Sequence, residues 1–428
     1  MSSPDRIDAA GWRIVLLASL GGTLEFYDFV IFGIFAKDIA DAVFPAANPI
    51  ASLMASFAAF AAGYLARPLG GIVLAHYGDR YGRRKVFIWS VFVMSAATLG
   101  MGLVPSYAQW GVAASALMVV LRLVQGFCLG GELPGALTYV VETAPRIAPF
   151  VSGLVFACVT MGVAVATGIS LSVRTLLDPE MVPLYGWRIA FVLGGLGGVL
   201  TFWLRRALEE SREFERMKSL ASRQPFTEML RTHARQVVVG SAVLAGTATF
   251  NGLFFSHLPA YLSAVLQYDP RQAVAAQTAG VLASALGILM TGWMGDRVPP
   301  RYLLRAGVVL LMVFAMPFYA ALEAKTGNLT LICTLAGLCA GLTNGSFAVL
   351  LTDLFPTRIR FTGVALIFNV SFTLFSGMAP LAATSLIRDT GAATSPAWLM
   401  MGSAALALVG SLWVKSSGGH VLEAKAGA

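Results

Sequence analysis

The chain has 428 residues, of which 57% are hydrophobic and 12% are charged, and its formal net charge is +8. Soluble globular proteins carry about 25% charged residues, so this composition excludes that class and indicates an integral membrane protein. The cations lie between apolar segments, so membrane topology explains them better than nucleic-acid binding does.

Twelve apolar segments of membrane-spanning length follow one another along the chain. Each predicts a transmembrane helix, because about 20 apolar residues cross the bilayer core and lipid cannot satisfy free backbone groups. The segments are residues 13–36, 52–77, 86–104, 108–131, 150–173, 187–207, 236–265, 272–294, 303–322, 328–351, 361–387 and 396–415. We therefore expect an all-α integral membrane protein with two six-helix bundles, 1–207 and 236–415, a cytoplasmic central loop at 208–235 and a cytoplasmic tail at 416–428.

The first span carries two acidic residues. Glu25 and Asp28 are three residues apart and share one helix face. A charge at membrane depth costs at least about 2.5–3.5 kcal/mol, so both are candidates for function, and that face must look into the protein. Tyr27 lies between them and is a candidate substrate-binding residue.

A short basic run, residues 78–85, separates the second and third spans. It contains four cations, one anion and two glycines, which predicts a tight turn at a membrane face. Lys and Arg concentrate on the cytoplasmic side, so the run and both termini should be cytoplasmic, and Arg67 falls at an inner helix end. Gly295-Asp296-Arg297 repeats part of this run after the eighth span, which suggests a repeat of the first half in the second.

The fourth span carries Arg122 in its middle portion, at the same depth as Asp28. An aspartate that faces an arginine stays ionised, and loss of that partner favours proton uptake. The pair is therefore a candidate proton switch. A static ion pair that holds two helices together is the alternative.

Two motifs indicate a family. Gly78-Asp79-Arg80 followed by Gly82-Arg83-Arg84, with His76-Tyr77 before it, resembles the loop signature of the major facilitator superfamily and its metabolite:proton symporters. The stretch from Arg122 through Gly130-Gly131-Glu132 and Glu142 to Pro145-Arg146 is similar to a signature of sugar porters and metabolite:proton symporters. The resemblance covers about residues 13–415 and implies the major facilitator fold.

The resemblance also implies roles for individual residues. Asp28 and Arg122 would couple protons to substrate, with Glu25 as the rival proton carrier. The residue pattern 353–363 looks like the loop between the tenth and eleventh spans of the symporters. The implied cytoplasmic gate comprises Gly78, Asp79, Arg80, Gly82, Arg83, Arg84, Glu132, Glu142, Arg146, Asp296, Arg297, Asp353 and Arg358.

Polar residues inside the second-half spans are weaker candidates. Asn251, Asn344 and Asn369 could bond a substrate together with Arg122, although hydrogen bonds between helices are the more frequent use of such residues. His257 is a candidate proton carrier, because an unperturbed histidine titrates near neutral pH, but a satisfied histidine near the membrane surface is the favoured interpretation.

The resemblance implies a secondary transporter of an inner membrane that works by alternating access. We expect proton symport of a small organic acid, because Arg122 supplies a cation suited to a carboxylate and parts of the chain resemble citrate and tricarboxylate members. Symport of oxoglutarate, shikimate, proline or betaine is the alternative, and a drug:proton antiporter is a weaker one. The sequence shows no phosphate-binding loop and no metal-ligand cluster, so we expect no enzyme activity, no cofactor, no nucleic-acid partner, and a monomer in membrane lipid driven by the proton gradient.

Overall fold

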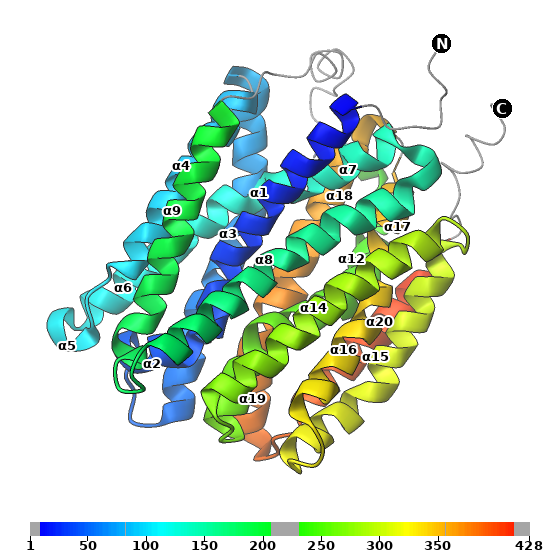
Figure 1. Cartoon of the computed structure of the whole chain (residues 1–428). Helices are drawn as coiled ribbons and strands as arrows, with labels where there is room; N and C mark the ends of the chain where they lie inside the picture. Colours follow the sequence, from blue (N-terminus) through cyan, green and yellow to red (C-terminus); the bar gives the residue numbers. More distant parts are fainter. Residues whose placement is uncertain (1–8, 82, 207–230, 356, 415–428) are drawn as a thin grey trace.

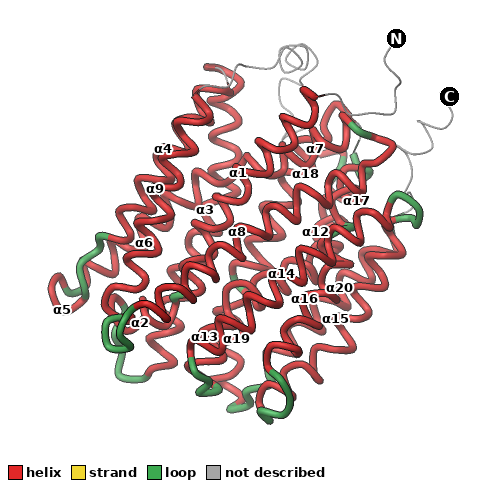
Figure 2. The backbone as a smooth tube through the Cα atoms, viewed as in Figure 1, coloured by secondary structure: helices red, strands yellow, loops and turns green. Residues whose placement is uncertain are grey.

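The computed structural model describes residues 9–81, 83–206, 231–355 and 357–414. These residues are helical apart from short loops, and no strand occurs among them (Figure 2). Eight described helices are long and apolar enough to span a membrane, and three shorter apolar helices accompany them. The chain is a multi-pass membrane protein, as its composition predicts.

The first half of the chain passes from one end of the bundle to the other six times (Figure 1). Each pass is called a crossing below. The crossings are α1 (Ala9–Ile34), α3 (Pro49–Tyr81), α4 (Arg83–Gly102), the run α6 (Val112–Cys128), η1 (Leu129–Gly131) and α7 (Glu132–Thr143), then α8 (Ala148–Leu176), and η3 (Val182–Gly186) with α9 (Trp187–Arg206). Two short helices, α2 (Ala36–Val43) and α5 (Tyr107–Trp110), lie between crossings.

The second half crosses six times as well. Its crossings are the run α12 (Ala234–Phe250), η4 (Asn251–His257), α13 (Leu258–Ala260) and η5 (Tyr261–Val265), then α14 (Pro270–Gly295), α15 (Pro300–Glu323), α16 (Leu329–Asn344) with α17 (Phe347–Thr352), the run α18 (Thr357–Ser371), η6 (Phe372–Gly377) and α19 (Ala379–Thr390), and α20 (Pro396–Leu412). Of these, η4, η5 and η6 are π-helical, a rare geometry that occurs frequently at functional sites.

Helices of the two halves pack closely where glycines remove side chains. α8 and α14 lie side by side (Figure 1), and a Cβ placed on Gly153 would be 3.1 Å from the Cα of Gly292. Within the second half, a Cβ on Gly252 of η4 would be only 2.3 Å from the carbonyl oxygen of Ser376 in η6. In lipid the hydrophobic effect does not drive helices together, so their association depends on close packing, which small residues permit.

The predicted spans agree with the structure except at the fourth crossing. We expected that helix to end at residue 131, but helix continues as α7 to Thr143. Gly130 and Gly131 lie in a 3-10 turn that joins α6 to α7. Pro134 lies in the first turn of α7, where a missing N–H costs no helix hydrogen bond. Below, "linker end" denotes the end of the bundle where α1 begins, α9 ends and α12 begins, and "opposite end" the other (Figure 1).

Candidate functional site

Asp28 is enclosed within the first half of the protein, where 1% of its surface is exposed. Thr98 of α4 donates its hydroxyl to Asp28 Oδ2 at 3.5 Å, and Asp28 Oδ1 has no hydrogen-bond partner among the described residues. A Cβ on Gly194 of α9 would lie 2.6 Å from that Oδ1, so a glycine makes room for the carboxylate. The site is therefore a tight buried pocket among α1, α4 and α9.

Arg122 is fully buried on α6. Its Nη1 donates to Gln125 Oε1, and its Nη2 donates to the Phe29 carbonyl at 3.3 Å. Its guanidinium carbon lies 4.4 Å from the ring centre of Phe29, 4.3 Å from that of Phe32 and 5.1 Å from that of Phe60. The cation is held by aromatic faces and neutral acceptors.

No direct ion pair joins Asp28 to Arg122, so the expected pairing is not made in this conformation of the described chain. Gln125 stands between them instead. Its Nε2 donates to Thr98 Oγ1 at 2.8 Å and to the Asp28 carbonyl at 3.2 Å, while its Oε1 accepts from Arg122. The physical reason is that the two Nη groups of Arg122 donate to neutral acceptors instead, Gln125 Oε1 and the Phe29 carbonyl.

Gln125 and Thr98 are the functional candidates that sequence reasoning missed. Both are fully buried and polar. A signal was available for Gln125, which follows Arg122 by three residues and so shares its helix face. Thr98 gives no such signal, because a single threonine in a span usually bonds its own helix, as Thr98 also does to the Met94 carbonyl at 3.0 Å.

The other first-span candidates lie on the same helix. Glu25 is buried, with 2% of its surface exposed. Tyr27 donates its hydroxyl to the Ala190 carbonyl of α9 at 2.7 Å, so that hydroxyl is directed into the first half and away from the second. The roles assigned to Glu25 and Tyr27 stay predictions.

The three second-half asparagines do not form one cluster. Asn251 Nδ2 donates to Asn344 Oδ1 at 3.1 Å, which joins the seventh and tenth crossings. Asn369 Nδ2 donates across the halves to the Gly130 carbonyl. The Oδ1 atoms of Asn251 and Asn369 have no partner among the described residues, so each keeps an acceptor for a ligand.

Contacts close the interface between the halves at the linker end. Besides Asn369 and Gly130, Asp296 Oδ1 accepts a hydrogen bond from the backbone N–H of Phe150 at 3.2 Å. Phe150 lies in the first turn of α8, where unpaired N–H groups and the helix dipole attract an anion. Partial burial raises the pKa of the Asp296 carboxyl, while this hydrogen bond and Arg297 act to lower it.

Most of the predicted gate lies where side chains are not described. Gly82 is outside the described residues. Only the backbone of the following residues is placed, within α3, α4, α7, η2 (Pro145–Ile147) and α18: Gly78, Asp79, Arg80, Arg83, Arg84, Glu132, Glu142, Arg146 and Arg358. Asp353 follows α17 and is half-buried, and Arg297 packs on the ring of Trp293. Asp296 makes a hydrogen bond that joins the two halves.

The halves also touch at the opposite end. A Cβ on Gly33 would lie 2.6 Å from the Cβ of Ser256, so α1 and η4 meet there without a gap. His257 packs against Phe57 of α3 with ring centres 5.3 Å apart, and its Nε2 is 3.2 Å from Thr384 Oγ1. Contacts between the two halves are thus present toward both ends of the described chain.

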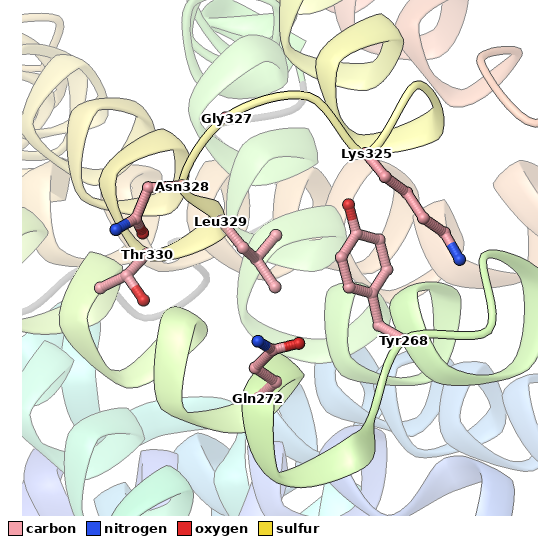
Figure 3. Close-up of a pocket in the computed structure, with 7 residues that line it drawn as sticks. All are labelled: Tyr268, Gln272, Lys325, Gly327, Asn328, Leu329 and Thr330. Atoms are coloured by element: carbon pink, nitrogen blue, oxygen red, sulfur yellow. The ribbon is translucent and has the colours of Figure 1, made fainter.

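A surface hollow of about 620 Å³ lies apart from these residues (Figure 3). Its lining residues, from the first turns of α14 and α16 and the loops before them, are Tyr268, Gln272, Lys325, Gly327, Asn328, Leu329 and Thr330. Tyr268 donates to the Leu322 carbonyl at 2.9 Å, the Lys325 ammonium lies 5.1 Å from its ring centre, and partial burial raises the pKa of its phenol. None of the predicted site residues lines this hollow.

Comparison with known proteins decides the family. Residues 18–380 match the family model of the Major Facilitator Superfamily. The chain belongs to this superfamily. The predicted family and fold are thus confirmed.

Two similar curated members of the superfamily are citrate-proton symporters. The one from Salmonella typhi is 32% identical over 424 residues, which cover 98% of each chain. The one from Klebsiella pneumoniae is 33% identical over 412 residues, which cover 95% of this chain and 93% of the relative. A proline/betaine transporter of Escherichia coli is 28% identical over 429 residues, 96% of this chain and 85% of the relative. These relatives are transporters and not enzymes, as the sequence predicted.

Among solved structures, a crystal structure of a D-xylose-proton symporter superposes with a TM-score of 0.72, covering 95% of this chain and 97% of that one at 16% identity. This likeness supports the major facilitator fold and, at such low identity, nothing about substrate.

Proposed function

We propose that this major facilitator is a proton-coupled symporter that takes up a small polycarboxylate such as citrate by alternating access, with residues 1–207 and 236–415 as the two moving bundles. The observation that carries the proposal is the buried Arg122, which faces Asp28 across Gln125 and lacks a carboxylate partner in the described chain. A substrate carboxylate supplies the missing anion. The two citrate-proton symporters among its relatives support this substrate class.

The coupling follows from the same contacts. A carboxylate that binds Arg122 competes for the donors now directed at Gln125 and Phe29. Gln125 is then free to turn, and the hydrogen bonds that it and Thr98 supply near Asp28 weaken. An aspartate in so buried a place with fewer donors takes up a proton. Proton and substrate each favour the state the other needs, so they cross together.

The remaining assignments complete this picture. The linker end faces the cytoplasm of an inner-membrane protein, both termini are cytoplasmic, and the protein works as a monomer without a cofactor. The gate residues named above, led by Asp296, close that end. The hydrogen bond from Asn369, a candidate substrate-binding residue, to the Gly130 carbonyl also joins the halves.

Uptake into proteoliposomes tests the proposal. Purified protein is reconstituted, an inward proton gradient is imposed, and labelled citrate, oxoglutarate, shikimate, proline and betaine are offered in parallel. We expect citrate to accumulate above its outside concentration and a protonophore to abolish that accumulation. Accumulation of proline or betaine without citrate would instead assign this protein the substrates named for the E. coli relative. Citrate uptake that does not depend on the proton gradient would refute proton coupling.

A further inference from the structure

A second arginine, Arg67 of α3, is buried at the interface between the halves. Only 2% of its surface is exposed, and its Nε and Nη2 donate to no acceptor among the described residues. Arg174, another buried arginine, does have a carboxylate partner: its Nη2 donates to Asp38 Oδ2 at 2.6 Å, although its Nε also lacks an acceptor among the described residues. Because a buried charge without a partner is costly, this arrangement calls for an anion.

Aromatic faces hold the guanidinium in place. Its central carbon lies 5.7 Å from the ring centre of Phe29 in α1, 5.4 Å from that of Tyr64 in α3 and 5.9 Å from that of Phe368 in α18. Such contacts attract the cation, but they use ring faces and leave N–H donors unused. The residue is thus positioned with its hydrogen-bonding capacity intact.

The unused donors of Arg67 lie on one edge of the guanidinium. Nε and Nη2 point in the same direction from the planar group, and this pair of N–H groups matches the two oxygens of a carboxylate. A lysine at this position would keep the charge and lose the paired donors.

Arg67 and Arg122 share the ring of Phe29. Their central carbons lie 5.7 and 4.4 Å from its centre, so both cations lie against the same ring, and neither has a carboxylate partner in the described chain. Arg122 also leaves its Nε without an acceptor. One ligand with two carboxylates can reach both cations and relieve their mutual repulsion.

The cluster also reaches the second half. Thr373 donates to the Tyr64 carbonyl at 2.8 Å, and the Tyr64 hydroxyl is 3.3 Å from Ser376 Oγ. Both partners lie in the π-helical η6. A ligand held at Arg67 is therefore next to the contacts that join the two halves.

We propose that Arg67 is a second substrate-binding residue, which takes one carboxylate on its Nε–Nη2 edge while Arg122 takes another, so that the protein selects ligands with at least two carboxylates. This inference rests on the proposed function and specifies its substrate class.

Equilibrium binding to purified protein tests the inference, with citrate, tricarballylate, glutarate and the monocarboxylate 2-hydroxyisobutyrate as probes. For the wild-type protein we expect citrate, tricarballylate and glutarate to bind at least about 10-fold more tightly than the monocarboxylate, because hydrogen bonds to a charged group contribute about one to two orders of magnitude each. Arg67→Lys and Arg67→Gln should weaken citrate binding about 10- to 100-fold and leave the monocarboxylate within about 3-fold. Arg174→Lys, remote from the cluster, is the matched control and should change neither.

The other possible results separate a failure of this inference from a failure of the proposed function. If the wild-type protein binds citrate and the Arg67 variants bind it equally well, the inference fails while the proposed function stands. If the variants weaken citrate and the monocarboxylate by the same factor, Arg67 only supports the fold, and the inference fails again. If neither variant can be purified folded, equal wild-type affinity for mono- and polycarboxylates overturns the inference and a 10-fold or greater preference supports it. If the wild-type protein binds no carboxylate, the proposed function has failed and takes this inference with it.

Discussion

Arg122 and Asp28 lie on facing helices without a direct ion pair, and the side chain of Gln125 joins them. Gln125 accepts from the arginine and donates to Thr98 and to the Asp28 carbonyl, so one amide touches the cation, the aspartate backbone and the hydroxyl that reaches the carboxylate. We expect a change at either charge to be transmitted to the other through this residue.

Replacement of Gln125 tests that connection. In Gln125→Leu the arginine and Thr98 each lose a partner, and buried hydrogen bonds to charged groups contribute about 1.5–3 kcal/mol. We expect proton-driven uptake to fall about 10-fold or more and to lose its dependence on the imposed pH gradient. Gln277→Leu is the matched control, because Gln277 is equally buried but donates only to the Phe254 and Phe255 carbonyls. Unchanged gradient dependence in Gln125→Leu would remove this residue from the coupling path.

Asp28 and Glu25 compete for the role of proton carrier. Asp28→Asn mimics the protonated form permanently, so it should lose accumulation driven by a proton gradient and keep exchange of labelled for unlabelled substrate. Glu25→Gln should keep both. The opposite outcome moves the role to Glu25, and normal accumulation in both variants contradicts coupling in the first span.

Arg122 should bind the substrate through its planar fork of donors. Arg122→Lys keeps the charge but loses that fork, so we expect an affinity loss of about 10- to 100-fold in equilibrium binding of citrate. Arg388→Lys is the control, since Arg388 is exposed and pairs with its neighbour Asp389 at 2.7 Å. Wild-type affinity in Arg122→Lys would show that the substrate binds elsewhere.

Asp296 should hold the linker end closed. Asp296→Ala removes both the hydrogen bond to the Phe150 N–H and a negative charge at the start of α8, together about 1 kcal/mol. We expect the population open at the linker end to rise about 5-fold, measured as longer distances between spin labels at the exposed positions Trp203 and Tyr302. Asp178→Ala, in an exposed loop at the opposite end, should leave the distances unchanged. An unaltered distribution in Asp296→Ala would deny this contact a gating role.

Gly33 should be required for closure of the opposite end. A Cβ at this position lies 2.8 Å from the Cα and carbonyl oxygen of Ser256, which are backbone atoms that cannot turn aside. Gly33→Val should therefore keep that end open, with uptake reduced by more than about 10-fold and cysteine reagents gaining access to a thiol introduced at Ser256. The control Gly168→Val adds a side chain where nothing lies within 4 Å of the new Cβ. Full transport by Gly33→Val would show that this close approach of α1 to η4 is not required for transport.

The sequence by itself determined the fold class, the number of crossings and the depth of Glu25, Asp28 and Arg122, because the cost of placing polar groups in lipid restricts each span to an apolar helix of fixed length. It also identified the superfamily through the motifs around Asp79 and Arg122. Only the tertiary structure decided which neighbour each of these side chains meets. Tyr27 turns towards α9, Gln125 separates Arg122 from Asp28, and Arg67 lies among rings from both halves. The physical reason is rotation about the helix axis: a membrane helix is apolar on nearly every face, so its hydrophobic pattern does not fix which face looks inward, and close packing against glycines of neighbouring helices does.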